Sequence, residues 1–169
     1  IGFASRDIRA GQHVHTHNVE MKGFERDYAI GSAASQTEYE PEPATFRGII
    51  RSDGRVATRN YIGIISTVNC SASVTRFIAD AFRGDALADY PNIDGIVPIT
   101  HGMGCASSGS DEGFEILLNT IDGYVRHPNF AGVLIIGLGC EVLQIGTLLN
   151  HKHLTASSAL QTMTIQDIG

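Results

Sequence analysis

The sequence predicts an α/β fold with a mostly parallel sheet and flanking helices, of which this chain holds an incomplete part. Three stretches carry the prediction: residues 61–71, 93–105 and 131–141. Each is an apolar run followed by a small polar or glycine-rich turn that contains a cysteine. Cys70, Cys105 and Cys140 are the only cysteines in the chain, and they recur every 35 positions (105 − 70 and 140 − 105). We therefore expect three parallel strands that deliver three thiols to one edge of one sheet.

Residues 1–24 are predicted to be a short β module, with a turn at residues 9–12 where Gly11 supplies a positive φ. His13, His15 and His17 alternate along the chain, so on a strand they would share one face. Neutral imidazoles suit iron, zinc or nickel, which makes these residues candidate metal ligands. The alternative is a solvated polar face of an edge strand, and the pattern leaves both interpretations open.

Residues 25–45 are predicted to be a linker, because their small residues, glutamates and prolines bury too little apolar surface to fold. The α/β domain then begins at residue 46 with a hairpin around the turn Ser52-Asp53-Gly54. Four arginines surround this turn: Arg47, Arg51, Arg55 and Arg59. Guanidinium groups grip carboxylates through paired hydrogen bonds, so the cluster is a candidate carboxylate clamp. Alternatively, the arginines pair with Asp53 or with other surface acids.

The rest of the chain alternates between strand and helix patterns. Strands are expected at residues 62–68, 95–100, 132–138 and 160–166, and helices at residues 74–83, 111–125 and 142–149. A turn is expected at residues 70–73. The second helix has the clearest apolar stripe, formed by Phe114, Leu117, Leu118 and Ile121. Right-handed crossovers would make the sheet parallel, and such sheets bind ligands beyond the carboxyl ends of their strands.

The chemistry at that edge centres on the cysteines. A thiol at a helix N-terminus is expected to have a lowered pKa, and Cys70 fits that position best. Thiolates bind iron, zinc or iron–sulfur clusters, so three of them could hold an iron site with one position open for substrate. The alternative is that the cysteines only pack, since Cys is among the most buried residue types.

Two further side chains lie in the same loops. His101 could be a general base or a metal ligand, or it could simply bond a loop carbonyl. Glu141 could bind metal or transfer a proton, or it could be an acid favoured by the first turn of a helix. The glycine-rich turns also allow a phosphate site, although no Walker lysine is present.

Composition excludes several classes of protein. With 169 residues, 43% apolar and 18% charged, the chain can bury one good core and a small second module. Its net charge of −6 disfavours nucleic acid and anionic membranes as partners. No apolar run reaches the roughly 20 residues of a membrane span, and no signal peptide is visible. The odd number of distant cysteines favours a reducing cytoplasm. The chain starts at Ile1 without an initiator Met, so we expect a piece of a longer polypeptide.

Several motifs resemble the altronate/galactarate dehydratase family of sugar-acid hydro-lyases and the related sulfolactate sulfo-lyases. They are F-R-G-I-I-R-S-D-G-R-V-A-T-R-N-Y-I, T-V-N-C-S, T-H-G-M-G-C, H-P-N-F-A and G-L-G-C-E. In addition, H-V-H-T-H-N resembles the end of the small β-clip (SAF-type) module that precedes the large domain in this family. The resemblance covers nearly the whole chain in order.

This resemblance implies iron-dependent loss of water from a sugar acid, giving a 2-keto-3-deoxy acid. It implies metal ligation by Cys70, Cys105 and Cys140 with His15 and His17, the iron being Fe²⁺ or part of a cluster. It implies substrate binding by Arg55, Arg59, Asn60 and Asn69, and catalysis by His101 with Glu141 and Asp53. A non-catalytic binding module of a larger enzyme and a sulfo-lyase are the alternatives. The sequence leaves open which sugar acid is used and the oligomeric state, a homo-oligomer included.

Overall fold

The computed structural model describes residues 2–23, 29–105 and 108–168. The chain divides into two compact units, Ile1–Ala44 and Thr45–Gly169. The second unit starts one residue before the predicted α/β domain. The identity of the first unit as a SAF-type module stays a prediction.

The first unit contains a two-stranded antiparallel hairpin formed by β1 (Gly2–Ala4) and β2 (Val19–Met21). The expected turn is present, with Gly11 at φ 83° and the amide of Gln12 donating to the carbonyl of Arg9 (3.0 Å). After this hairpin, the described residues 29–44 contain no helix or strand and are exposed, as a linker would be.

The three alternating histidines do not lie on a strand, which corrects the prediction. Buried Asn18 folds the segment into a turn, because its side chain accepts from the amide of His15 (2.9 Å) and donates to the carbonyl of His13 (2.9 Å). The imidazole rings nevertheless stack in series, with centroids 5.4 Å apart for His13 and His15 and 6.3 Å apart for His15 and His17.

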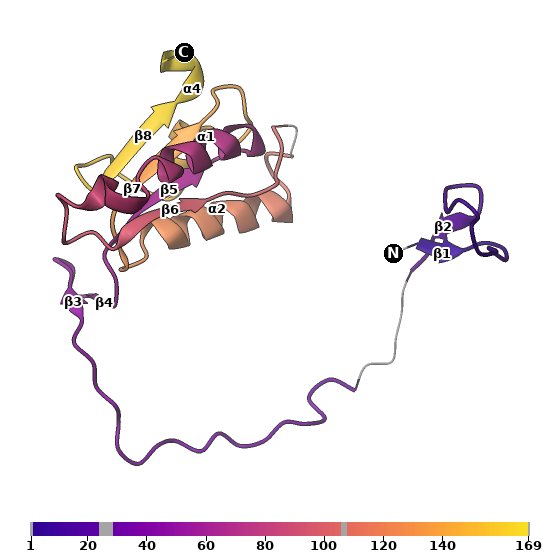
Figure 1. The fold of residues 1–169 in the computed structure, drawn as a ribbon, viewed down its shortest axis with the longest axis horizontal. Helices are drawn as coiled ribbons and strands as arrows, with labels where there is room; N and C mark the ends of the chain where they lie inside the picture. Colours follow the sequence, from indigo (N-terminus) through magenta and orange to yellow (C-terminus); the bar gives the residue numbers. More distant parts are fainter. Residues whose placement is uncertain (1, 24–28, 106–107, 169) are drawn as a thin grey trace. The chain divides into compact units, whose positions relative to one another are not determined.

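The second unit holds a small hairpin and then a four-stranded parallel sheet flanked by helices, as predicted (Figure 1). The hairpin is β3 (Ile49–Ile50) and β4 (Val56–Ala57), and Gly54 in its turn has φ 83°. The remaining elements are, in chain order, β5 (Tyr61–Ser66), α1 (Asn69–Asp80), the 3-10 helix η1 (Gly84–Leu87), β6 (Gly95–Ile99), α2 (Glu112–Val125), β7 (Phe130–Gly137), α3 (Ile145–His151), β8 (Leu160–Thr164) and α4 (Ile165–Ile168). The strand order is β6-β5-β7-β8, so β5 lies between the other two strands that lead to cysteines.

Neighbouring residues on β5 point to opposite faces of the sheet and build two cores. Ile65 packs with the predicted stripe of α2 and with Leu148 of α3. Ile64 packs with Ala79 of α1 and with Ile136 of β7 on the other face. Right-handed crossovers explain this layering, because α1 connects strands in the direction opposite to α2 and α3.

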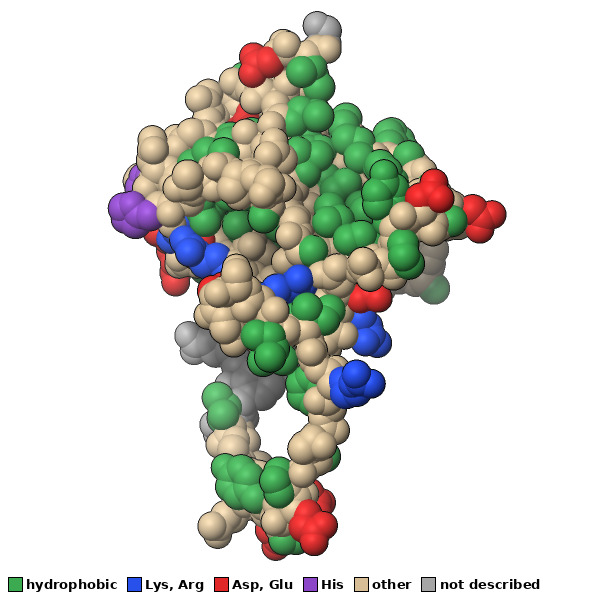
Figure 2. All heavy atoms as spheres, turned by 90° about the vertical axis from the view of Figure 1, so that its left-hand side faces the viewer, with side chains coloured by type: hydrophobic (Ala, Val, Ile, Leu, Met, Phe, Trp, Pro, Cys, Tyr) green, Lys and Arg blue, Asp and Glu red, His purple; other side chains and the backbone are tan. Residues whose placement is uncertain are grey.

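Helix α1 covers its face of the sheet incompletely. An apolar groove of about 460 Å³ remains there, lined by Ile62, Ile78, Phe82, Leu87, Tyr90 and Leu134 among others. Figure 2 shows hydrophobic side chains gathered over one face of the α/β unit. None of the helices in the described part of the chain combines the length and apolar character that a membrane span requires.

Two boundaries differ from the predictions. Residues 70–73 are helical and not a turn, because α1 begins at Asn69, three positions after the last residue of β5. The hydroxyl of Ser71 lies 3.0 Å from the carbonyl oxygens of both Val68 and Ile136, so its single proton is shared between two acceptors inside the first turn of the helix. At the other end of the chain, residues 165 and 166 belong to α4 and not to the fourth strand.

Candidate functional site

The three thiols follow three adjacent strands at the same end of the sheet. Cys70 is the second residue of α1, which follows β5. Cys105 lies in the loop after β6, and Cys140 lies in the loop after β7. Parallel strands bring their carboxyl ends together, and all three cysteines are exposed and reduced at that edge. We call this edge the thiol edge.

Cys70 lies close enough to Cys105 and Cys140 to be affected by both of these thiols. The pKa of Cys70 is raised, first because the surrounding loops desolvate the thiolate, and then because of the like charge of Cys105 and Cys140 and a hydrogen bond with Cys105. This corrects the expected lowering of its pKa by the helix N-terminus. Desolvation, followed by the two neighbouring thiols, outweighs the backbone hydrogen bond at Cys70 that would lower the pKa.

The chemistry of this donor set fits iron, because thiolates are ligands that iron accepts and a cation would relieve their mutual repulsion. The arrangement of the side chains, however, does not form a complete metal site. Within residues 2–23, 29–105 and 108–168, no group of three or more His, Cys, Asp or Glu side chains is arranged to hold one metal ion. The thiols thus share a surface without forming a finished three-ligand site. His15 and His17 belong to the other unit, and their part in a metal site stays a prediction.

His101 uses both of its ring nitrogens within the protein. Nδ1 accepts from the amide of Met103 (3.1 Å), and Nε2 lies 3.2 Å from the carbonyl oxygen of Ser66. A carbonyl can only accept, so Nε2 carries the proton and the ring is neutral. Burial lowers the pKa of His101, and the bonds to the backbone at Ser66 and Thr67 offset this only in part. In this arrangement no lone pair is left for a substrate proton, which does not support the role of base.

Glu141 is buried, with 4% of its surface exposed, and its carboxylate is fully engaged. Oε1 accepts from the hydroxyl of Thr67 (2.8 Å) and the amide of Leu138 (3.1 Å), and Oε2 accepts from the amide of Gly139 (2.6 Å). Burial alone would raise the pKa of Glu141, but these hydrogen bonds outweigh it and lower the pKa. The ionised carboxylate thus has three internal partners.

The thiol edge also contains residues that the sequence analysis passed over. Thr67 is one, because a threonine in an apolar run gives no signal that its hydroxyl will meet an acid 74 positions later. Arg76 is another: its guanidinium donates to the hydroxyl of Thr100 at the end of β6 (2.8 Å). Asn69, a predicted substrate-binding residue, also lies at the thiol edge. It is exposed, and its backbone amide donates to the carbonyl of Met103 (2.8 Å).

A polar pocket of about 220 Å³ lies beside the Cys140 loop. It is lined by Gly139, Glu141, Gln144, Thr164, Gln166 and Asp167, among others. The pocket lies between the carboxyl ends of β7 and β8, where parallel sheets bind ligands. Its amide, hydroxyl and carboxyl groups could hydrogen-bond a polyhydroxylated molecule.

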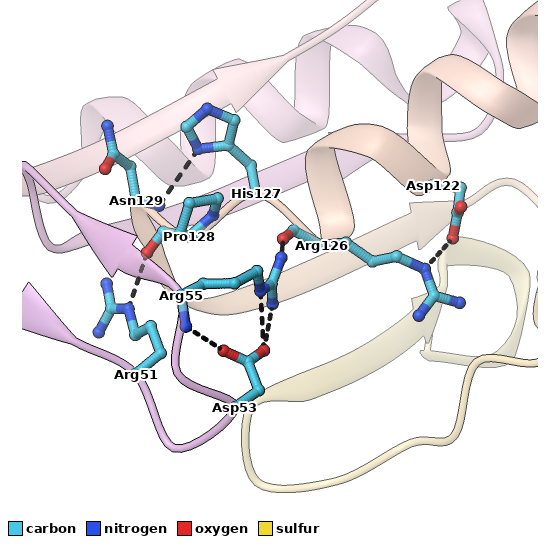
Figure 3. A network of polar contacts seen from close by, with 8 residues as sticks. All are labelled: Arg51, Asp53, Arg55, Asp122, Arg126, His127, Pro128 and Asn129. Atoms are coloured by element: carbon cyan, nitrogen blue, oxygen red, sulfur yellow. Dashed lines mark hydrogen bonds and ion pairs between the residues drawn. The ribbon is translucent and has the colours of Figure 1, made fainter.

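The predicted carboxylate clamp lies at the opposite end of the sheet. Asp53 and Arg55 pair with each other (2.6 Å), and Arg55 also donates to the carbonyl of Arg126, the C-cap of α2 (Figure 3). The hydrogen bonds from Arg55 hold the pKa of Asp53 below its usual value. Both residues precede β5, so its six residues, roughly 20 Å of strand, separate them from the thiols.

The other members of this group also bind the protein itself. Arg51 donates to the carbonyl of Pro128 (2.7 Å), as Figure 3 shows, and Arg59 donates to the carbonyl of Thr58 (2.9 Å). Asn60 donates to the carbonyl of Asn92 (2.5 Å), and its buried side-chain oxygen has no partner among the described residues. The structure therefore brings Asn69, His101 and Glu141 to the thiol edge but not Asp53, Arg55, Arg59 or Asn60.

This arrangement defines a class of protein: an α/β domain whose ligand edge lies beyond the carboxyl ends of parallel strands and carries three thiols. Residues 48–169 match the family model for D-galactarate dehydratase/altronate hydrolase, second domain. The chain therefore belongs to the D-galactarate dehydratase/altronate hydrolase family.

Curated relatives agree with the family. An altronate dehydratase of Bacillus subtilis (strain 168) is 31% identical over 99% of this chain and 34% of its own length. An altronate dehydratase of Escherichia coli (strain K12) is 34% identical over 86% of this chain and 29% of its own length. A galactarate dehydratase (L-threo-forming) of the same organism is 35% identical over 88% of this chain and 29% of its own length. The chain thus spans about a third of the length of these relatives.

Proposed function

We propose that this chain is part of an iron-dependent hydro-lyase that dehydrates a sugar acid of the altronate or galactarate type to a 2-keto-3-deoxy acid. The observation that supports the proposal is the thiol edge, where Cys105 and Cys140 lie close enough to Cys70 to affect its pKa, in a chain of this family. The names of the relatives support the substrate class. A sulfo-lyase reaction remains the alternative that substrate tests would separate.

The reaction needs three events at one carbon skeleton. The proton α to the carboxylate leaves, its electron pair forms the carbon–carbon double bond, and the β-hydroxyl departs with a proton as water. The resulting enol then becomes the 2-keto acid. Iron held by Cys70, Cys105 and Cys140 would act as a Lewis acid toward the carboxylate and the departing hydroxyl.

The chain's own residues would bind and orient the substrate. Arg76 is the cation that the described α/β unit carries at the carboxyl end of β6, so we assign it the substrate carboxylate and the charge that develops on it. Asn69 and the polar pocket beside the Cys140 loop would hydrogen-bond the hydroxyl groups. The earlier prediction for Arg55 and Arg59 lacks this support, since both grip the protein's own carbonyls.

The proposal is tested by calorimetric titration of galactarate and altronate into the chain under anaerobic conditions, with and without ferrous iron. We expect binding that strengthens with iron and that disappears in a Cys70→Ser variant. An equal affinity with and without iron, together with full iron content in all three Cys→Ser variants, would reject the thiol edge as the metal site.

A further inference from the structure

His101 and Glu141 share one structural role. Each lies in a thiol-bearing loop. Each is hydrogen-bonded to the backbone of its own loop and to the end of β5, at its last residue Ser66 or at the next residue, Thr67. His101 joins the amide of Met103 to the carbonyl of Ser66. Glu141 joins the amides of Leu138 and Gly139 to the hydroxyl of Thr67.

The end of β5 is well suited to receive both links. Ser66 and Thr67 are fully or almost fully buried, and Cys70 follows three residues later in the first turn of α1. The first turn is itself bound to β7 and to the β6 loop, through Ser71 to the carbonyl of Ile136 and through Asn69 to the carbonyl of Met103. Any shift of the neighbouring loops relative to Cys70 would break these bonds.

The carboxylate of Glu141 occupies a space that the strand leaves for it. A Cβ atom at Gly137, the last residue of β7, would lie 2.6 Å from Oε1 of Glu141, so only glycine admits the carboxylate. Gly139 has φ +124°, a conformation that favours glycine, and this aims its amide at Oε2. One glycine at the end of β7 and one in the following loop thus accommodate the carboxylate of Glu141.

We infer that His101 and Glu141 are positioning residues, which hold the Cys105 and Cys140 loops against the end of β5 so that their thiols lie beside Cys70. This inference rests on the proposed function of the thiol edge. It assigns neither residue a proton transfer, since both ring nitrogens of His101 and both oxygens of Glu141 are occupied by partners within the protein. Supporting groups of this kind change metal affinity by roughly 10- to 100-fold when they are removed.

His101 is tested with a matched control in the same chain. His127 also accepts a hydrogen bond at Nδ1 from the backbone amide two residues ahead, that of Asn129 (3.1 Å). His127, however, lies at the other end of the sheet. An asparagine at either position keeps an acceptor for that amide, so His101→Asn removes mainly the link to Ser66. We expect His101→Asn to weaken Co²⁺ binding by the full chain about tenfold and to reduce the thiolate-to-cobalt absorption, with His127→Asn unchanged.

Glu141 is tested through its partner. Thr67→Val removes the hydroxyl that binds the carboxylate, whereas Thr67→Ser retains it and should rescue Co²⁺ affinity. Glu141→Gln should also weaken Co²⁺ binding about tenfold, with Glu115→Gln on the exposed face of α2 as its control. Far-ultraviolet circular dichroism of each variant checks that the fold persists, so that a loss of affinity reports the loop and not unfolding.

Two readouts need no metal and separate this inference from the proposed function. Nitrogen-15 spectra of the imidazoles should show His101 as the neutral tautomer protonated at Nε2. Hydrogen exchange of the Leu138 and Gly139 amides should be about tenfold faster in Glu141→Gln than in the wild type.

The opposite tautomer of His101, unchanged hydrogen exchange, or Co²⁺ spectra identical to wild type in His101→Asn and Thr67→Val would overturn the inference. Unaltered Co²⁺ binding in the three Cys→Ser variants would instead reject the proposed function, and the tautomer and exchange data would still decide the positioning role.

Discussion

At the thiol edge, the exposed Cys70 interacts with Cys105 and with Cys140, while the amino end of the same sheet holds arginines that interact with the backbone. Arg51 and Arg55 bond the carbonyls of Pro128 and Arg126, where α2 ends and β7 begins (Figure 3). A cation at a helix C-terminus complements the partial negative charge of the exposed carbonyls. The arginines of the amino end are therefore bound to the protein itself, whereas the thiol edge keeps three thiols exposed.

The two histidines at these ends show the same difference on a smaller scale. His101 and His127 each accept an amide two residues ahead in the sequence. The ring of His127 then packs edge-on against Phe130, with centroids 6.0 Å apart, whereas that of His101 reaches across to the carbonyl of Ser66. The same local hydrogen bond therefore stabilises a turn at one end of the sheet, whereas at the other end the histidine also links its loop to the end of β5.

The largest effect should come from Cys70→Ser, because Cys70 responds to both other thiols. We expect iron or Co²⁺ binding to fall below detection, since a serine hydroxyl is a far weaker ligand than a thiolate at neutral pH. The thermal midpoint should stay near that of the wild type because the side chain is exposed. Metal analysis after gel filtration measures this, with Ser73→Ala as the control. Retention of full metal content would remove the contrast between the two ends.

Arg76→Ala should have the next largest effect, on substrate binding and not on folding. Loss of one charge-assisted hydrogen bond should weaken galactarate binding by about tenfold or more. The control is Arg83→Ala, which removes an exposed arginine paired with Asp80 (2.7 Å) just beyond the other end of α1. Isothermal titration with iron present compares the two variants. Equal losses in both would show that general charge, and not position at the thiol edge, attracts the ligand.

Arg51→Ala should have the opposite effect to Arg76→Ala: it should change stability and not binding. Removing its bond to the carbonyl of Pro128 should lower the free energy of unfolding by about 1 kcal/mol and leave Co²⁺ binding unchanged. Urea unfolding followed by circular dichroism measures the change, and Arg47→Ala, at an exposed arginine of the same segment, provides the control. A clear loss of galactarate binding in Arg51→Ala would return the amino end to the candidate site.

The smallest effect should be a dependence of stability on pH that originates at the thiol edge. Burial lowers the pKa of His101, so the unfolded chain binds a proton there more readily than the folded chain. Stability should therefore fall as pH drops below the ordinary histidine pKa of 6.5, and it should level off above it. Thermal unfolding between about pH 5 and 7 measures the slope, which His101→Asn should reduce. An unchanged slope in that variant would assign it to other groups.

The sequence by itself determined the fold class, the succession of strands and helices along the chain in the second unit, and the gathering of three thiols at one edge. Periodicity reports burial directly, as in the stripe of α2, and parallel strands place whatever follows them at one end of the sheet. The family also followed from motifs that are contiguous in the chain.

Only the tertiary structure decided what the polar side chains near those motifs do. The acceptors of Arg51 and Arg55 are carbonyls more than 70 positions away. The partners of His101 and Glu141 at the end of β5 are 35 and 74 positions away in the chain. Hydrogen-bond geometry depends on positions within a fraction of an ångström, which residue type and spacing do not encode. The arginines looked like a substrate clamp and the histidine like a base because their chemistry allows those roles; their partners in the fold assign them others.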